Sequence, residues 1–110
     1  MPSITGAGVI HIAHFTLRPE LTEEQKEAYF RTAQAFDTVP GILGVDQGPN
    51  IEENSPYMYT RIIYYADAAA REALHRHPLH IRFGEKYSQP MTERRISYTI
   101  QLLNKNQPGA

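Results

Sequence analysis

Two histidines that lie far apart in the sequence are the residues best suited to chemistry in this chain. His80 ends the segment 77–80, His-Pro-Leu-His, and His11 lies within the apolar run 9–17. The proline fixes the turn that carries His80, and the alternation of 9–17 predicts a strand that carries His11. Imidazole is the side chain whose unperturbed pKa lies near neutral pH. The two rings therefore predict a metal-free proton-transfer pocket in which His80 acts as the base.

Tyr59 and Arg61 share one face of a strand predicted over 57–65. A reaction at a carbon next to a carbonyl needs a base for the carbon-bound proton and a donor for the developing oxyanion. Tyr59 can donate to that oxygen or fix the tautomer of His80. Arg61 can hold a carboxylate or an enolate in a bidentate grip. We expect Tyr59 to act with the two histidines and Arg61 to bind substrate.

Each of these residues also has a structural explanation. His11 can be a core histidine whose ring nitrogens meet backbone groups, and His80 can cap a short helix or bond the preceding turn. Tyr59 and Arg61 can be an amphipathic pair at the end of the sheet, with Arg61 reaching solvent or a glutamate. An enclosed apolar pocket that reaches His80, Tyr59 and Arg61 favours an enzyme, whereas a filled interior favours a structural protein.

The composition excludes several classes of site. The 110 residues contain no cysteine, so disulfides, thiolate nucleophiles and cysteine-based metal sites are ruled out. A net charge of −1, with lysine and arginine scattered along the chain, argues against a nucleic-acid partner. No segment approaches the roughly 20 apolar residues that span a bilayer, and 1–8 lacks signal-peptide features. We expect one cytoplasmic domain over 1–110, without a membrane partner and with frayed tails at 1–8 and 104–110.

Three histidines raise the question of a metal site, because His75, His77 and His80 form the pattern H-x-H-x-x-H. Side chains at i and i+2 of a helix diverge, and Pro78 interrupts the spacing. No dinucleotide or phosphate-binding fingerprint is visible either. We therefore expect no metal and no cofactor. His77 is expected to brace the turn before Pro78, and His75 and His14 to lie at the surface or in a dimer seam.

The predicted order of elements is β-α-β-β-α-β. Thr22 and Gln25 form a capping box at the start of the first helix, and Asp67 can cap the second. Short connections and right-handed crossovers place both helices on one face of an antiparallel sheet, which is a ferredoxin-like α+β fold. The expected strands are 9–17, 42–47, 57–65 and 95–103, and the expected helices are 23–37 and 68–76, the latter restarting after Pro78 through about Tyr87.

One face of this sheet is left without a covering layer. It carries too much apolar surface for a monomer to leave in water. A second copy is the simplest cover, and two sheets packed face to face give a twofold homodimer, a dimeric α+β barrel. The residues predicted on the uncovered face are Ile10, Ile12, Ile62, Tyr64 and Leu103.

The covered face is expected to hold the pocket. Tyr29 and Phe30 of the first helix are core residues, but core residues of a helix can also line a pocket. Phe83 shares a helix face with His80, and Gly84 leaves a gap one turn beyond His80.

Taken together and in order, these pieces resemble the stress-responsive dimeric α+β barrel (Dabb) proteins, and among them the olivetolic acid cyclase type. The resemblance covers 9–103. It rests on His11 opening the first strand, on 21–27 (Leu-Thr-Glu-Glu-Gln-Lys-Glu), 40–42 (Pro-Gly-Ile) and 48–50 (Gly-Pro-Asn), and on 77–80 followed by Phe83 and Gly84.

The resemblance implies a cofactor-free pocket between helices and sheet that binds a linear poly-β-ketone and closes a ring by an aldol step. His11 and His80 match the two histidines of that pocket, and the second is the base. Three positions depart from the cyclase pattern. Tyr59 replaces a strand histidine, Leu74 replaces a catalytic tyrosine of the second helix, and Ala33 replaces a pocket tyrosine of the first, which predicts a larger cavity.

The first functional hypothesis is a cofactor-independent, polyketide cyclase-like lyase or isomerase of secondary metabolism, acting on a small polyketide or aromatic-type substrate. His80, His11 and Tyr59 are its predicted catalytic residues. The predicted substrate-binding residues are Arg61, Tyr29, Phe30, Ala33, Phe83 and Leu74. The alternative is a non-catalytic stress-response barrel whose dimer is the functional object. A third option is a haem-using or quinone-forming monooxygenase on the same barrel.

Overall fold

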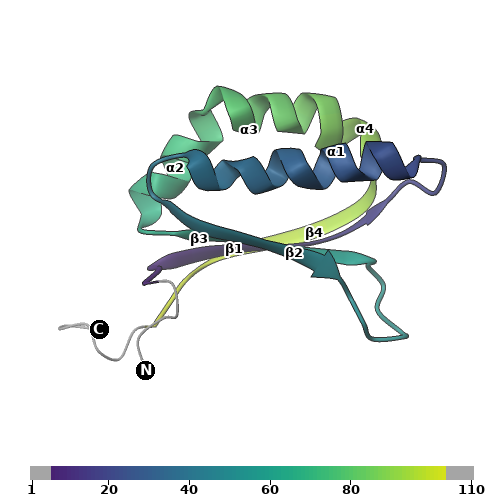
Figure 1. The fold of residues 1–110 in the computed structure, drawn as a ribbon. Helices are drawn as coiled ribbons and strands as arrows, with labels where there is room; N and C mark the ends of the chain where they lie inside the picture. Colours follow the sequence, from purple (N-terminus) through teal and green to yellow (C-terminus); the bar gives the residue numbers. More distant parts are fainter. Residues whose placement is uncertain (1–5, 104–110) are drawn as a thin grey trace.

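The computed structural model describes residues 6–103. They form one antiparallel sheet in the order β2-β3-β1-β4, with the helices together on one face (Figure 1). The strands are β1 (Val9–Leu17), β2 (Ile42–Pro49), β3 (Tyr59–Tyr65) and β4 (Thr92–Gln101). The helices are α1 (Glu23–Gln34), α2 (Ala68–Arg76), α3 (Pro78–Phe83) and α4 (Gln89–Met91), with a 3-10 turn at Ala35–Thr38 and a π turn at Gly84–Ser88. The predicted ferredoxin-like α+β fold is confirmed.

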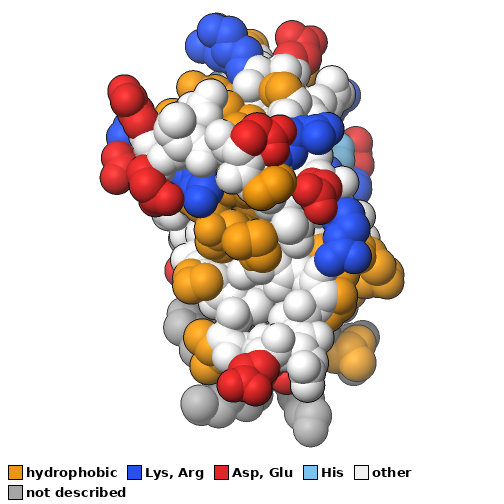
Figure 2. All heavy atoms as spheres, turned by 90° about the vertical axis from the view of Figure 1, so that its right-hand side faces the viewer, with side chains coloured by type: hydrophobic (Ala, Val, Ile, Leu, Met, Phe, Trp, Pro, Cys, Tyr) orange, Lys and Arg blue, Asp and Glu red, His pale blue; other side chains and the backbone are white. Residues whose placement is uncertain are grey.

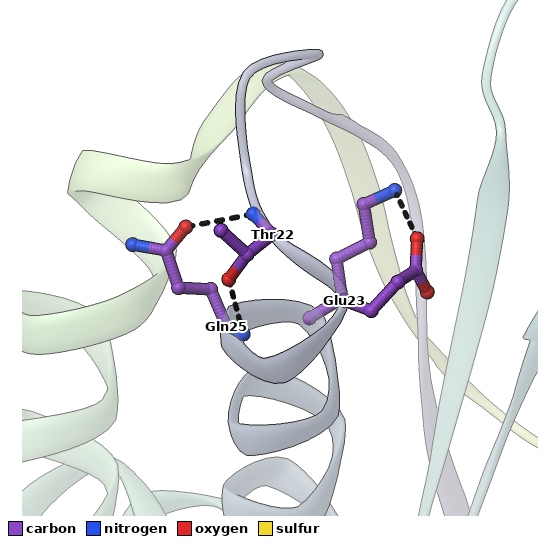
Figure 3. A network of polar contacts seen from close by, with 4 residues as sticks. Thr22, Glu23 and Gln25 are labelled. Atoms are coloured by element: carbon purple, nitrogen blue, oxygen red, sulfur yellow. Dashed lines mark hydrogen bonds and ion pairs between the residues drawn. The ribbon is translucent and has the colours of Figure 1, made fainter.

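A capping box starts α1, as the sequence predicts (Figure 3). The Thr22 hydroxyl accepts a hydrogen bond from the backbone N–H of Gln25 at 3.1 Å, and the Gln25 side chain accepts one from the N–H of Thr22 at 2.8 Å. The α-helix ends at Gln34 and not at Asp37, because the chain tightens into a 3-10 turn before Pro40. That turn places Phe36 in the core.

The predicted break between α2 and α3 lies at His77. The Asp67 carboxylate accepts from the N–H of Ala70 at 2.8 Å and caps α2. His77 is extended because proline follows it, and its Nδ1 accepts from the N–H of Leu79 at 3.1 Å. His77 therefore braces the turn, as predicted. It also caps α3, which is the structural role that the sequence had suggested for His80.

The helical layer continues further than predicted. Instead of stopping near Tyr87, the chain passes through the π turn into α4 and ends at Met91. In this turn the N–H of Gln89 bonds the carbonyl of Gly84, so one extra residue is inserted into the helical repeat.

The core lies between the sheet and the helices. Alternate residues of β1 and β3 point into it, and its largest fully buried side chains are Tyr29, Tyr65, Phe15, Phe36 and Leu74. Burying such a side chain contributes about 1.5–3 kcal/mol. The core therefore fixes the helices on the sheet and with them the positions of the residues above it.

The opposite face of the sheet is bare of helices in the described part of the chain (Figure 1). Register places Ile12 between Ile62 and Tyr98, and Ile10 between Tyr64 and Ile100, so these side chains form one apolar surface. Ile96, Tyr98 and Ile100 of β4 are 36%, 59% and 44% exposed. Leu103, predicted on this face, lies beyond the end of β4. On the side of the molecule shown in Figure 2, most of the charged side chains lie in the upper half, which is the helical half.

The ends of the described segment are tied to the sheet. The N–H of Gly8 donates to the Tyr65 carbonyl at 3.0 Å, and the N–H of Leu102 donates to the Gly8 carbonyl at 2.9 Å. Ala7 is buried. Of the predicted frayed tails, 1–5 and 104–110 lie outside the described residues. Between 6 and 103, every helix is too short or too polar to cross a bilayer.

Candidate functional site

A cavity of about 500 Å³ lies between the inner face of the sheet and the helices α2 and α3. This volume is typical of sites for small organic molecules. In the sheet below it, Ala13 of β1 is paired with two cavity residues, Arg61 on one side and Ser97 on the other. The lining residues are His11, Phe36, Arg61, Ile63, Tyr65, Arg71, His75, His80, Phe83, Gly84, Ser88, Arg95, Ser97 and Thr99.

His80 presents an unengaged ring to this cavity. Its ring stacks against that of His75, with centroids 5.0 Å apart and 15° between the planes, and lies 5.5 Å from that of Phe36. Within residues 6–103, no group hydrogen-bonds to either ring nitrogen. Desolvation, followed by the charges of His75, Arg95 and Arg61, lowers the pKa of His80 to about 4. The imidazole is therefore neutral at pH 7 and has a lone pair available to accept a proton.

His11 is held between two side chains. Its Nδ1 lies 2.8 Å from the hydroxyl of Thr99, and its Nε2 lies 3.4 Å from Nη2 of Arg95. A guanidinium only donates, so Nε2 accepts and Nδ1 carries the proton that it donates to Thr99. Desolvation and the nearby arginines, Arg95 first, lower its pKa to about 4. The polar partners are side chains and not the backbone groups of the structural explanation.

Arg61 is a buried cation, with only 3% of its surface exposed. Its Nη1 donates to the Tyr29 hydroxyl at 3.2 Å and to the Gln47 side-chain oxygen at 3.4 Å. Its Cζ lies 4.9 Å from the ring centre of Phe15, 5.1 Å from that of Phe83 and 5.5 Å from that of Tyr29. Among the described residues it has no carboxylate partner. Arg61 therefore points inward among aromatic rings and does not reach solvent or a glutamate.

The structure does not bring Tyr59 to the histidines. Its ring stacks on Phe15, with centroids 5.7 Å apart, and meets Phe30 edge-on at 5.0 Å. Tyr59 and Phe30 border a separate groove of about 420 Å³ near Gln47. Tyr59 shares its strand face with Arg61, but two residues of strand separate them by about 6.6 Å. The prediction that Tyr59 and Arg61 share a strand face is correct. Tyr59 nevertheless lies too far along the strand to line the cavity.

The other predicted binding residues divide into three groups. Phe83 lines the cavity. Tyr29 does not line the cavity itself, but its hydroxyl accepts a hydrogen bond from Arg61, which does. Ala33 and Leu74 are fully buried in the core and are absent from the cavity wall, so the small side chain at Ala33 does not enlarge the cavity.

Several cavity residues were missed from the sequence, among them Arg71, His75 and Arg95. Arg95 has the same strand parity as Ser97 and Thr99, so alternation along β4 could have placed it on the inner face. Arg71 and His75 lie one turn apart on α2, which puts them on one side of that helix. His75 is exposed, as expected for a surface residue, and it also stacks on His80 at the cavity.

The cavity is positively charged. Arg61, Arg71 and Arg95 line it, and none of the described lining residues is aspartate or glutamate. Nη1 of Arg71 lies 3.1 Å from the carboxylate of Glu72, which is exposed and outside the cavity, and the buried Nε of Arg71 has no partner. Desolvation and the charge of Arg61 lower the pKa of Arg95. Between 6 and 103, no group of three or more histidine and acidic side chains could hold a metal ion.

This arrangement supports acid–base chemistry. A neutral imidazole can remove a proton from a carbon next to a carbonyl, and a nearby guanidinium can stabilise the resulting enolate oxygen. The phenyl rings of Phe36 and Phe83 provide an apolar wall that strengthens such electrostatic interactions.

Solved structures share this fold. A Dabb-family protein of Mesorhizobium loti is 21% identical, with a TM-score of 0.77 over 87% of this chain and 97% of its own. A dimeric ferredoxin-like protein of unknown function from Thermobifida fusca is 19% identical, with a TM-score of 0.75 over 93% and 99%. A hydroxynitrile lyase from Passiflora edulis is 13% identical, with a TM-score of 0.77 over 91% and 96%. At these identities the likeness shows the fold alone.

No curated protein sequence matches the chain. Residues 9–100 do match the model of a family described as the stress responsive A/B barrel domain, and this match covers the three cavity histidines and the three cavity arginines. The chain therefore belongs to the stress responsive A/B barrel (Dabb) family.

Proposed function

We propose that this protein is a cofactor-independent lyase or isomerase that uses His80 as a general base on a small polyketide or aromatic-type carbonyl compound. One observation carries the proposal. A neutral imidazole without a hydrogen-bond partner in the described chain faces the same 500 Å³ cavity as a buried, unpaired guanidinium, that of Arg61. We further propose a cytoplasmic role in secondary metabolism, which remains a prediction from the sequence.

In the proposed reaction, a ring nitrogen of His80 accepts a proton from the carbon next to the substrate carbonyl. The electron pair of the broken C–H bond forms an enolate, and its oxygen lies toward Arg61 or Arg95. Protonated His80 then returns the proton, to a second carbon in an isomerisation or to the oxygen of an attacked carbonyl in an aldol closure. Since Tyr59 lies in another groove, the donor role predicted for it passes to the arginines.

His11 has a supporting part in this scheme. Both of its ring nitrogens are engaged, so it is poorly placed to move a proton itself. It accepts from Arg95 and thereby orients that guanidinium. Phe83 packs over Arg61 and closes the apolar side of the cavity.

The known relatives support the coarser part of the proposal. A Passiflora edulis protein of the same fold is described as a hydroxynitrile lyase, so lyase chemistry occurs on this scaffold. A dimeric state is also part of the proposal, because proteins of this fold from Thermobifida fusca, Bacteroides fragilis and Jannaschia are described as dimeric. The bare apolar face of the sheet supplies the surface for a twofold dimer.

The test is a proton-exchange assay that does not require the natural substrate. Benzoylpropionate, an aromatic keto acid, is incubated with the protein in deuterated water, and loss of the proton signal next to its ketone is followed by NMR. We expect His80→Gln to lower the enzyme-dependent rate by about 100-fold or more, since removing a general base has effects of this order.

His14→Gln is the matched control, because His14 is a strand histidine on the opposite face that bonds a threonine as His11 does. It should leave the exchange rate unchanged. Equal rates for H80Q and the unchanged protein would assign the cavity to a non-catalytic stress-response barrel instead.

A further inference from the structure

The cavity contains an excess of positive charge that the described protein does not neutralise. Arg61, Arg71 and Arg95 line it, and among residues 6–103 no acidic side chain does. Removing a guanidinium from water is costly unless it is paired and hydrogen-bonded. The aromatic rings around Arg61 offset part of this cost, since cation–π contacts contribute about 0.5–2 kcal/mol.

The hydrogen-bonding capacity of Arg61 is mostly unused. A guanidinium has five N–H donors, yet within the described residues only Nη1 has partners, and both of its bonds are long. Nε and Nη2 make no hydrogen bond to these residues. The planar fork that matches a carboxylate is therefore available on Arg61, the one charged side chain that is buried among the described residues.

Arg95 approaches the same space from the neighbouring side of the sheet. β1 lies between β3, which carries Arg61, and β4, which carries Arg95. Arg61 pairs with Ala13 of β1, and Ala13 pairs in turn with Ser97 of β4, two residues along the strand from Arg95. Both arginines line the same cavity. His11, fixed by Thr99, accepts one hydrogen bond from Arg95, and no other described residue accepts one from this guanidinium.

We infer that Arg61 and Arg95 together form a carboxylate-binding site and that the ligand is an organic acid with an apolar or aromatic body. Phe36, Ile63 and Phe83 supply the surface for that body, opposite the charged end. His11 is a positioning residue that holds Arg95 toward the acid. The inference rests on the proposed function and names its substrate class: the substrate carries a free carboxylate.

A bound acid would also change the basicity of His80. A bound carboxylate would offset the positive charge of Arg61 and Arg95, two of the causes that depress the pKa of His80. Substrate binding would then make His80 a stronger base than it is in the empty cavity. The acid is in this way both a handle for orientation and a part of the proton-transfer site.

The experiment measures binding by calorimetry at constant ionic strength, with the full chain. Benzoate and phenylbutyrate are the acids, their primary amides are the uncharged counterparts, and phenyl phosphate tests a different anion. We expect both acids to bind and the amides to bind at least tenfold more weakly, since a guanidinium forms its strongest hydrogen bonds with a charged acceptor. Phenyl phosphate that binds more tightly than benzoate would identify a phosphate site and not a carboxylate site.

Variants then assign the site. Arg95→Gln should weaken benzoate binding about tenfold or more, the usual loss for a hydrogen bond to a charged group. Arg61→Gln should do the same, but Arg95 is the safer test because it is more exposed and its loss leaves the core intact. Arg76→Gln, which removes an exposed arginine from α2 outside the cavity, should bind benzoate as the unchanged protein does.

His11→Gln tests positioning through coupling. It should weaken benzoate binding in the unchanged protein and have no further effect once Arg95 is replaced. A merely structural role for His11 would weaken binding in both backgrounds.

The outcomes separate the two proposals. Amides that bind as tightly as the acids, acids that fail to bind at millimolar concentration, tighter binding of phenyl phosphate, or an R95Q protein with unchanged affinity would each overturn the carboxylate site. His80→Gln should keep benzoate binding while losing proton exchange, so failure of the base leaves the acid site standing and failure of the acid site leaves the base standing.

Discussion

Two histidines of β1 make the same hydrogen bond on opposite faces of the sheet. His11 lies 2.8 Å from the Thr99 hydroxyl on the inner face, and His14 lies 2.8 Å from the Thr60 hydroxyl on the outer face. Thr60 donates onward to Asn50 at 2.6 Å, whereas the second nitrogen of His11 meets Arg95. The inner face thus joins imidazole to a guanidinium and a cavity, and the outer face joins it to a neutral chain of polar groups.

The contrast shows that a strand histidine with a threonine partner is not in itself a site. What distinguishes His11 is the surrounding charge and desolvation, which lower its pKa to about 4. The outer face has a different character, because apolar side chains such as Ile12 and Tyr98 surround its polar chain. We assign chemistry to the inner face and assembly to the outer face, and the predictions below test this division.

The largest expected effect is on assembly. Tyr98→Asp places a charge in the middle of the outer apolar surface, where a dimer would bury it without a partner, and should weaken self-association by more than 100-fold. Sedimentation measures the change. Glu93→Gln, at an exposed position of the same strand, serves as the control. A Tyr98→Asp protein that sediments with the mass of the unchanged protein would refute the outer face as the dimer surface.

A tenfold effect should separate two tyrosines of the helix-facing side. Tyr29→Phe removes the hydroxyl that accepts from Arg61, loosens that guanidinium and should slow proton exchange about tenfold. Tyr59→Phe removes a hydroxyl in a different groove and should leave the rate within about twofold, the ordinary variation for a change that touches nothing in the cavity. If Tyr59→Phe were the slower enzyme, the donor role predicted from the sequence would be restored.

Tyr59 shows which parts of the site could be predicted from the sequence. Alternation assigned Tyr59 and Arg61 to the correct face, because side chains of a strand repeat every two residues. The ring on which a side chain stacks depends on elements that are distant in the sequence. Tyr59 packs against Phe15 of β1 and Phe30 of α1, and alternation along β3 does not predict these contacts. Local chemistry was more predictable, as the caps formed by Thr22, Asp67 and His77 show.

The rest of the cavity depended on packing that no local pattern encodes. His11, His80, Arg61 and Phe83 were expected at the pocket and line it. Arg95 lies on β4 and Arg71 lies on α2, and the packing of the helices on the complete sheet brings these two elements to the same cavity. The π turn has no sequence signature comparable to a cap, yet it brings Ser88 to the cavity wall.

A smaller effect, on stability, follows from the depressed histidine pKa values. Unfolded, each histidine takes up its proton near pH 6.5, whereas His11 and His80 in the native state do so near pH 4. Between these values the unfolded chain binds more protons, so the free energy of unfolding falls as the pH falls from 6.5 to 4. Each histidine contributes about 1 kcal/mol to this loss after solvent screening.

Urea unfolding between pH 7.5 and 4 measures this slope. His11→Gln should flatten it, because glutamine takes up no proton. His14→Gln provides the comparison on the outer face. A slope unchanged by His11→Gln would mean that the ring is not held neutral by its surroundings.

The smallest predicted effect concerns Gly84 in the π turn, where a side chain would point into open space. Its φ of −59° and ψ of −48° are ordinary helical values, and a Cβ built there meets nothing within 4 Å. Gly84→Ala should therefore raise the free energy of unfolding by about 0.5–1 kcal/mol, the usual helical preference for alanine. Gly41→Ala should do the opposite, since Gly41 has a φ of +90° and its Cβ would lie 2.7 Å from that of Ala70. Thermal unfolding of the two variants measures the pair, and a loss of stability in Gly84→Ala would mean that the space above this residue is not the open cavity on which the inner-face chemistry depends.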